Sequence, residues 1–286
     1  MTSRQKDSAK AFAANTFIRL FLAASCILVV IPLLFMVTAS FMRAIDVMKM
    51  PYPWLPNPVH IQNYFHAIAG NDNSYIYLRN IANSLIVAVT VTVSTVLLGS
   101  LTGFGLAKYR FKGRTIAFMA IMATMMIPFE TIMVPLYMVV MNLHMQNTYA
   151  GLIVPFLVNA FAIFQMRQYL VTFPEEVLDA ARIDGASEFS IFRRIVFPNC
   201  APAIATLAVL TFRQQWDNLL WPLLVAQSET MKTIPAYIVR FAAEKYSDEG
   251  VMMAVAVIAS IPIFILFFSL SKYFVGGSSV YAAGKE

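Results

Sequence analysis

A cluster of polar side chains interrupts a long apolar run near residue 215. The segment TFRQQWDNLLWP contains five residues suited to binding a solute: Arg213, Gln214, Trp216, Asp217 and Asn218. Their amides and carboxylate can hydrogen-bond hydroxyl groups, and the indole can stack on a sugar ring. Charged groups at membrane depth cost about 2.5–3.5 kcal/mol and usually face water or a partner. The segment predicts a solute pathway or, because Arg213 and Asp217 share a helix face, a structural ion pair.

Catalytic and metal-binding patterns are absent from the sequence. It has no G-x-x-x-x-G-K-[ST] phosphate loop, no H-E-x-x-H and no nucleophile elbow. His60, His66 and His144 are scattered, and Cys26 and Cys200 lie in or beside apolar stretches, so neither a metal site nor a disulfide framework is expected. We therefore expect no catalytic residue and no cofactor bound by this chain; any ATP and magnesium would be bound and used by a partner ATPase.

The composition indicates that the chain is embedded in a membrane. Of its 286 residues, 59% are hydrophobic and 13% are charged, whereas a soluble domain carries about 25% charged residues. The net charge of +6 comes from basic residues in short flanks around apolar runs, a pattern typical of membrane topology rather than of nucleic-acid binding. The first apolar run is too long for the core of a signal peptide, so we expect a retained first span.

Six apolar runs approach or exceed the roughly 20 residues that a membrane span requires. We predict one membrane domain over 1–286, an all-α protein with spans at about 17–42, 80–107, 115–141, 149–171, 201–226 and 250–271. The third span contains Glu130 between Pro128 and Pro135; this acid either pairs with a neighbouring helix or marks a gate. In the second span, Gly99 and Gly103 permit close helix packing.

Basic residues predict the orientation of these spans. One face receives fourteen of them: Arg4, Lys6, Lys10, Arg19, Lys108, Arg110, Lys112, Arg114, Arg167, Arg182, Arg193, Arg194, Lys272 and Lys285. The opposite face receives six: Arg43, Lys49, Arg79, Lys232, Arg240 and Lys245. Because cytoplasmic loops carry the excess of lysine and arginine, both termini and the loop over 172–200 are predicted to be cytoplasmic.

This loop contains a polar segment, PEEVLDAARIDGASEFSIFRRIVFP, that favours two short helices. Thr172 and Glu175 fit a capping box, with Pro174 in the first turn. Gly185 can end the first helix in a left-handed conformation, and Ser187 can cap the second. The pattern predicts a helix–turn–helix elbow. It is either a solvated amphipathic loop at the membrane surface or a docking element for a cytoplasmic partner.

The elbow resembles the cytoplasmic signature of ABC importer permeases, E-A-A-x3-G-x9-I-x-L-P. The corresponding residues are Asp179, Ala180, Ala181, Gly185, Ile195, Phe197 and Pro198. Aspartate replaces the signature glutamate and phenylalanine its leucine. The segments GLAKYRFKGR (105–114), IPFETIMVPLY (127–137) and WDNLLWPLL (216–224) resemble the carbohydrate branch, specifically the second permease subunit of maltose-type importers. That branch has a Trp-Asn-acid pattern where this chain has Trp216-Asp217-Asn218.

The resemblance implies a MetI-like permease fold of six transmembrane helices with a cytoplasmic coupling-helix elbow. The elbow residues implied to dock an ATPase are Glu176, Asp179, Ala180, Ala181, Asp184 and Gly185. The implied assembly contains a second permease subunit in a heterodimer, two cytoplasmic ATPase subunits and an extracytoplasmic solute-binding protein. Its location is a bacterial inner membrane, in contact with lipid and not with nucleic acid.

Two other functional classes stay open at this point. A stand-alone secondary transporter would need ion-coupling acids near the midplane, for which Glu130 and Asp217 are the candidates. A membrane scaffold would need no solute path. For a carbohydrate importer, the solutes left open are neutral oligosaccharides, acidic oligosaccharides and glycerol phosphates.

Overall fold

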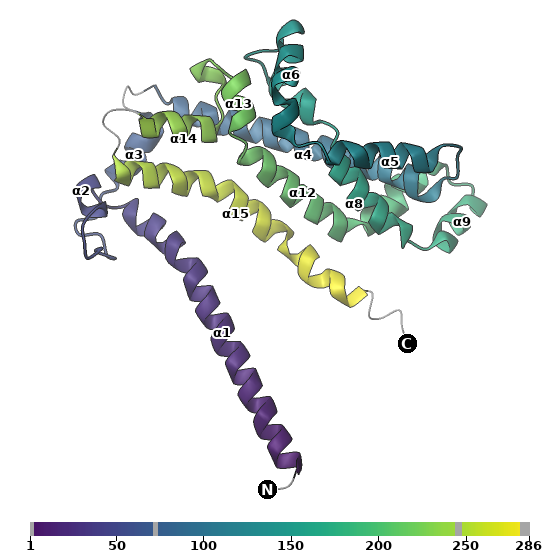
Figure 1. Ribbon diagram of the computed structural model, residues 1–286, viewed down its shortest axis with the longest axis horizontal. Helices are drawn as coiled ribbons and strands as arrows, with labels where there is room; N and C mark the ends of the chain where they lie inside the picture. Colours follow the sequence, from purple (N-terminus) through teal and green to yellow (C-terminus); the bar gives the residue numbers. More distant parts are fainter. Residues whose placement is uncertain (1–2, 71–73, 244–247, 281–286) are drawn as a thin grey trace. The chain divides into compact units, whose positions relative to one another are not determined.

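The computed structural model describes residues 3–70, 74–243 and 248–280, and every element in those ranges is a helix (Figure 1). Among them, four helices are long and apolar enough to cross a membrane, and two bent helix pairs raise the number to as many as six. The prediction of an all-helical membrane protein is confirmed. Lys245 and Lys285, which entered the orientation argument, lie outside the described residues.

The chain divides into two compact units, residues 1–74 with 241–259 and residues 75–240 with 260–286. The single domain expected over 1–286 stays a prediction. The first unit contains α1 (Ser3–Ala39), α2 (Ala44–Val47), α3 (Gln62–Ala69) and the start of α15 (Glu249–Val280). Its small core joins Ala39, Met42 and Val47 to Met253. The buried Asn63 amide donates to the carbonyl oxygens of Ser40 and Met42, at 2.9 and 2.7 Å.

The second unit holds most of the helices. They are α4 (Ile76–Lys108), α5 (Arg114–Met125), α6 (Phe129–Asn142), α7 (Tyr149–Ile153), η1 (Val154–Phe156), α8 (Ala160–Val171), α9 (Glu175–Ile183), α10 (Glu188–Ile191), η2 (Phe192–Val196), α11 (Phe197–Asn199), α12 (Ala201–Trp216), α13 (Leu220–Val225), η3 (Glu229–Met231) and α14 (Ile234–Ala243). The part of α15 from Ser260 also belongs to this unit, whereas the end of α14, residues 241–243, belongs to the first unit.

The long helix α4 packs along both α8 and α12 (Figure 1). Its glycines explain the close approach to α8. A Cβ atom on Gly99 would lie 2.8 Å from the Cβ of Ala162, and one on Gly103 would lie 2.8 Å from the Cβ of Met166. Cβ atoms essentially never approach another atom this closely, so larger residues would push the two helices apart. The close packing that the glycine spacing predicts is confirmed.

Three of the predicted spans correspond to interrupted helices. The span over 115–141 consists of α5 and α6, bent by 97° where Pro128 precedes α6. The span over 149–171 consists of α7, η1 and α8, and the span over 201–226 consists of α12 and α13. Each interruption leaves backbone groups without helical partners, and these must be satisfied by other protein groups or by water.

Polar side chains of α4 hold the segment between α13 and α14. The Asn83 amide donates to the carbonyl oxygens of Thr230 and Lys232, at 2.9 Å each. The Asn83 carbonyl oxygen accepts from the Tyr149 hydroxyl at 2.7 Å, and Ser84 accepts from the backbone N–H of Ile234 at 2.8 Å. This segment, which contains no α-helix, thereby finds partners for its backbone groups in a largely apolar chain.

Candidate functional site

The three helix interruptions meet at one open pocket of about 730 Å³. The α5–α6 break contributes Ile127, the η1–α8 break contributes Val158 and Asn159, and the α12–α13 break contributes Asn218 and Leu219. Non-helical backbone at membrane depth is tolerated where it is buried in protein or lines a water-filled cavity. All three breaks therefore border the same cavity. The separate apolar runs of the sequence do not show that these breaks lie close together.

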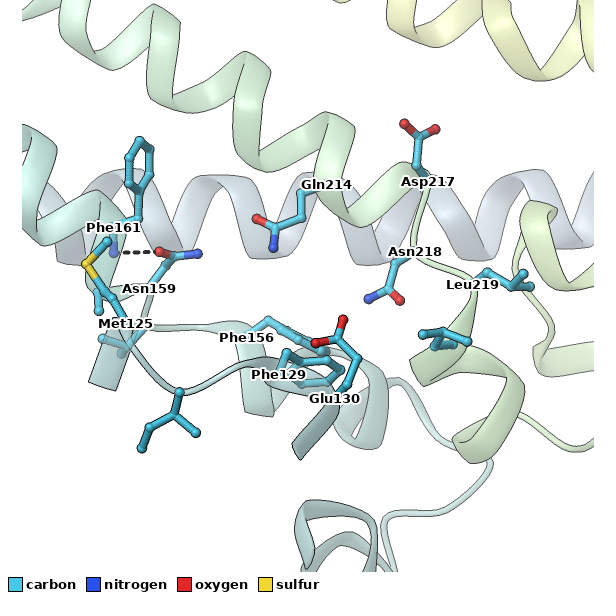
Figure 2. A pocket seen from close by; sticks show the side chains of 14 residues that line it. Met125, Phe129, Glu130, Phe156, Asn159, Phe161, Gln214, Asp217, Asn218 and Leu219 are labelled. Carbon is cyan, nitrogen blue, oxygen red and sulfur yellow. Dashed lines mark hydrogen bonds between the residues drawn. The ribbon is translucent and has the colours of Figure 1, made fainter. Parts of the chain in front are cut away.

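Five polar side chains line the pocket: Glu130, Asn159, Gln214, Asp217 and Asn218. Figure 2 shows Glu130, Gln214 and Asn218 turned toward a shared space, while the carboxylate of Asp217 points away from Glu130. Glu130 lies in the first turn of α6, where a negative charge is stabilised by the helix dipole. Asn159 caps α8, since its side-chain oxygen accepts from the N–H groups of Phe161 and Ala162 at 2.8 and 3.3 Å.

Aromatic rings form an apolar wall beside these polar groups. Phe129 and Phe156 line the pocket, with ring centroids 5.5 Å apart. Both rings pack against Trp221 at 5.9 Å. Trp221 is fully buried, and its indole N–H donates to the carbonyl oxygen of Gly151 at 3.0 Å. The anchored tryptophan thus supports both phenylalanines in the wall.

The predicted pathway residues separate into two groups. Gln214, Asp217 and Asn218 line the pocket, whereas Arg213 and Trp216 do not. Arg213 and Asp217 form the predicted ion pair, with Nε 3.4 Å from the carboxylate. Both side chains are more than half exposed, 68% and 53%, so the pair contributes little to stability. The sugar-stacking role suggested for Trp216 does not fit its position, because its side chain is buried and stacks on Phe212.

The elbow contains the predicted helix, turn and second helix. Gly185 has a φ of +80° and follows α9. Its N–H donates to the carbonyl oxygen of Arg182, and the N–H of Ala186 donates to that of Ala181, each at 3.0 Å. These two bonds define a Schellman cap, which needs a left-handed residue at this position. Ser187 caps α10 by accepting from the N–H of Ser190 at 3.3 Å.

The predicted capping box at the start of α9 is wrong. Pro174 occupies the cap position, and no side chain caps the helix there. Thr172 instead ends α8, and its hydroxyl donates to the carbonyl oxygen of Tyr169 at 2.8 Å. The sequence spacing fits a capping box, but α8 continues far enough for its own end to use the threonine.

The elbow has an inner and an outer face. Leu178 and Ala181 are buried in a core with Met166, Ile191 and Leu207. The Ala181 side chain therefore packs mainly into this core, and its role in docking stays a prediction. The other predicted docking residues are exposed: Glu176, Asp179, Ala180, Asp184 and Gly185.

Exposed apolar side chains on the elbow were missed by sequence reasoning. Ile183 is 86% exposed, Phe189 64% and Val177 43%. Ile183 is the last residue of α9 and lies within the Schellman turn closed by the bond from Ala186 to Ala181. Its exposure depends on how α9 rotates onto the core, and this rotation is not visible in the signature spacing. The pocket aromatics Phe129 and Phe156 were missed because they come from separate segments that only tertiary packing brings together.

The residues that the structure describes contain no group of three His, Cys, Asp or Glu side chains arranged to hold a metal ion. The pocket offers carboxylate, amide and aromatic groups instead. This set suits hydrogen bonding to a polyhydroxylated solute and contact with its apolar faces.

Comparisons with known proteins match most of the chain. Residues 95–277 match the family described as binding-protein-dependent transport system inner membrane component. The arabinooligosaccharides transport system permease protein AraQ of Halalkalibacterium halodurans is 34% identical over 253 residues, covering 88% of this chain and 90% of AraQ. The sn-glycerol-3-phosphate transport system permease protein UgpE of Brucella abortus (strain 2308) is 32% identical over 269 residues, covering 92% and 95%.

A solved structure shares the fold. It is a chain of a bacterial ABC transporter involved in the import of the acidic polysaccharide alginate, with a TM-score of 0.79. The match covers 96% of this chain and 99% of the other, at 23% sequence identity. The expected permease fold is confirmed.

Proposed function

This chain belongs to the family of binding-protein-dependent transport system inner membrane components, and we propose that it forms part of the solute path of an importer for a neutral carbohydrate. As a member of that family it is a transport subunit of the inner membrane and not an enzyme. It works with a partner permease, an ATPase and a solute-binding protein.

The observation that carries the proposed path is the meeting of three helix breaks at one pocket. Interrupted membrane helices are a recurrent way to place polar groups and unwound backbone around a transported solute. Gln214, Asn218 and Glu130 supply hydrogen-bonding groups, while Phe129 and Phe156 supply apolar surface. Of the predicted pathway residues, we retain Gln214, Asp217 and Asn218 and assign Trp216 to packing. Arg213 serves to neutralise Asp217.

The charges around the pocket favour a neutral solute over an anionic one. Two carboxylates line it: Asp217 is paired with Arg213, which leaves the negative charge of Glu130. The residues that line the pocket include no lysine or arginine. The first N–H groups of α8 already bond to Asn159, and the start of α6 carries Glu130, so neither helix end is open to an anion. AraQ is named for arabinooligosaccharides and UgpE for sn-glycerol-3-phosphate. Of these two kinds of solute, the pocket suits the first.

The outer face of the elbow is the proposed docking surface for the ATPase. It combines Asp179 and Asp184 with the exposed Ile183 and the open surface at Gly185, where an added Cβ would meet no atom within 4 Å. An apolar side chain with polar neighbours is the usual composition of a protein interface centre and its rim. Ile183→Asp should release the ATPase from the purified complex, whereas Ile183→Met should retain it.

The complete assembly proposed is a heterodimer of this chain with a second permease subunit, two ATPase subunits that bind ATP and magnesium, and an extracytoplasmic receptor. Both termini would be cytoplasmic, as the basic-residue asymmetry favours. Labelling of either terminus from outside intact cells would contradict this orientation.

The pocket is tested by replacing a lining amide with an apolar residue of similar size. Gln214→Leu should lower ATP-driven uptake per assembled complex roughly tenfold, because a lost hydrogen bond leaves a solute hydroxyl unsatisfied. The matched control is Gln168→Leu, the same change at an exposed position of α8 outside the pocket. Equal uptake by the two variants would rule out the pocket as the solute path.

A further inference from the structure

A buried lysine joins the end of α4 to the start of the elbow. The Lys108 side chain is only 3% exposed, and its Nζ donates to the carbonyl oxygen of Phe173 at 2.6 Å. Phe173 lies in the short connection between α8 and α9. The same Nζ is 3.9 Å from the carboxylate of Glu175, the first residue of α9. One ammonium group therefore contacts both the joint and the first turn of the elbow helix.

Burying an ammonium group is costly unless hydrogen bonds and opposite charge compensate it. A leucine could pack at the end of α4 without this cost. The position of Lys108 in the last turn of α4 offsets part of it through the helix dipole, and the Phe173 carbonyl oxygen supplies a directed partner. The hydrogen bond from Lys108 to Phe173 constrains both the distance and the orientation of the α8–α9 connection relative to α4. Apolar packing alone has no such directional requirement.

The next residue, Tyr109, reaches the second half of the elbow. Its hydroxyl donates to Glu188 in the first turn of α10. Glu188 also accepts from Arg182 of α9 at 2.8 Å, and Arg182 donates to Asp179 at 2.8 Å. Burial, and then the bond to Glu188, raises the pKa of Tyr109 to about 12, so the hydroxyl keeps its proton at physiological pH.

We propose that Lys108 and Tyr109 are positioning residues that make α4 move with the elbow. We call these two residues, with the Phe173 carbonyl and Glu188, the α4 latch. The proposal rests on the proposed docking of the ATPase to the elbow. If the elbow moved without α4, the bonds of Lys108 to Phe173 and of Tyr109 to Glu188 would break. If α4 moved with it, both bonds would be kept, and α8 and α12, which pack along α4 and border the pocket, would be shifted as well.

The test uses the whole complex, co-expressed with its partner permease, ATPase and receptor and placed in proteoliposomes. The measured quantity is solute transported per ATP hydrolysed. A role in folding alone would lower the amount of complex without changing this ratio. Lys108→Met removes the charged donor, and Tyr109→Phe removes only the hydroxyl while keeping the ring that packs on Phe104.

We expect the ratio to fall about tenfold for Lys108→Met and roughly threefold for Tyr109→Phe, in line with losing a charged and a smaller polar contact. Lys108→Arg retains a cationic donor and should restore most of the ratio. The matched control is Lys112→Met, the same change in the exposed loop that follows α4, and it should leave the ratio unchanged. An unchanged ratio in Tyr109→Phe and in assembled Lys108→Met would overturn the latch.

Failure of the latch and failure of elbow docking give different results. If Ile183→Asp releases the ATPase but neither latch variant changes the ratio, docking stands and the latch is wrong. If the Ile183→Asp complex keeps an active ATPase bound, docking at the elbow is wrong. The latch proposal, which rests on that docking, is then wrong as well. If Lys108→Met does not assemble, the Tyr109→Phe ratio alone decides.

Discussion

The rings of Phe212 and Trp216 stack one turn apart on α12, with centroids 5.5 Å apart and planes 15° from parallel. Trp216 is only 3% exposed, so nearly all of its side chain packs against other residues of the protein. Trp216→Ala should lower stability by about 3–5 kcal/mol, as expected for emptying a large buried site. Thermal unfolding of the purified complex would measure this loss, with the milder Trp216→Phe as control.

The same variants separate packing from solute contact. Uptake normalised to assembled Trp216→Ala complex should stay close to the unsubstituted level, because Trp216 does not line the pocket. Normal stability combined with lost uptake would instead restore the sugar-stacking role that the sequence suggests.

Two glycines of α4 provide a matched pair for testing the helix contact. A Cβ on Gly103 would lie 2.8 Å from Met166 and 2.9 Å from the backbone nitrogen of Arg167, whereas a Cβ on Gly105 would have no neighbour within 4 Å. Gly103→Ala should therefore lower the unfolding temperature despite the better helix propensity of alanine. Gly105→Ala should leave it unchanged or raise it slightly, by up to about 1 kcal/mol in stability. Equal shifts would contradict the close contact of α4 and α8.

Substitutions of Gly185 in the turn of the elbow should lower stability in a defined order. Because Gly185 has a φ of +80° and open space around its Cβ position, the cost of substitution is backbone strain and not a clash. Gly185→Ala should cost about 1–2 kcal/mol, Gly185→Val more and Gly185→Asn less. The unfolding temperature and the amount of ATPase that co-purifies with the complex should both follow this order. If the same amount of ATPase co-purified with all three variants, the conformation of the turn would not contribute to docking.

The local features of the elbow could be predicted from the sequence. The left-handed Gly185 and the Ser187 cap depend on residues a few positions apart, and both are confirmed. The Thr172 cap was predicted wrongly because two helix ends compete for that residue. Ala181 belongs to the signature, yet the signature does not reveal which side of α9 packs on the core.

The pocket could be predicted only in part. Gln214 and Asn218 are visible as polar residues in an apolar run, but Phe129 and Phe156 join them through tertiary packing of separate segments. Whether a tryptophan faces a pocket or a neighbouring ring is decided by its place around α12, which the quoted motif does not fix. The bond of Lys108 to Phe173 spans 65 residues, beyond the reach of any local pattern.

Uptake by the reconstituted complex tests the central claim most directly. Proteoliposomes containing this chain, its partner permease and the ATPase would be supplied with the receptor and with a labelled neutral oligosaccharide or labelled sn-glycerol-3-phosphate. We predict uptake of the neutral oligosaccharide that requires internal ATP and persists when an ionophore dissipates ion gradients. Uptake of sn-glycerol-3-phosphate alone would contradict the proposed solute class, and uptake that needs an ion gradient but no ATP would contradict the assigned transport mechanism.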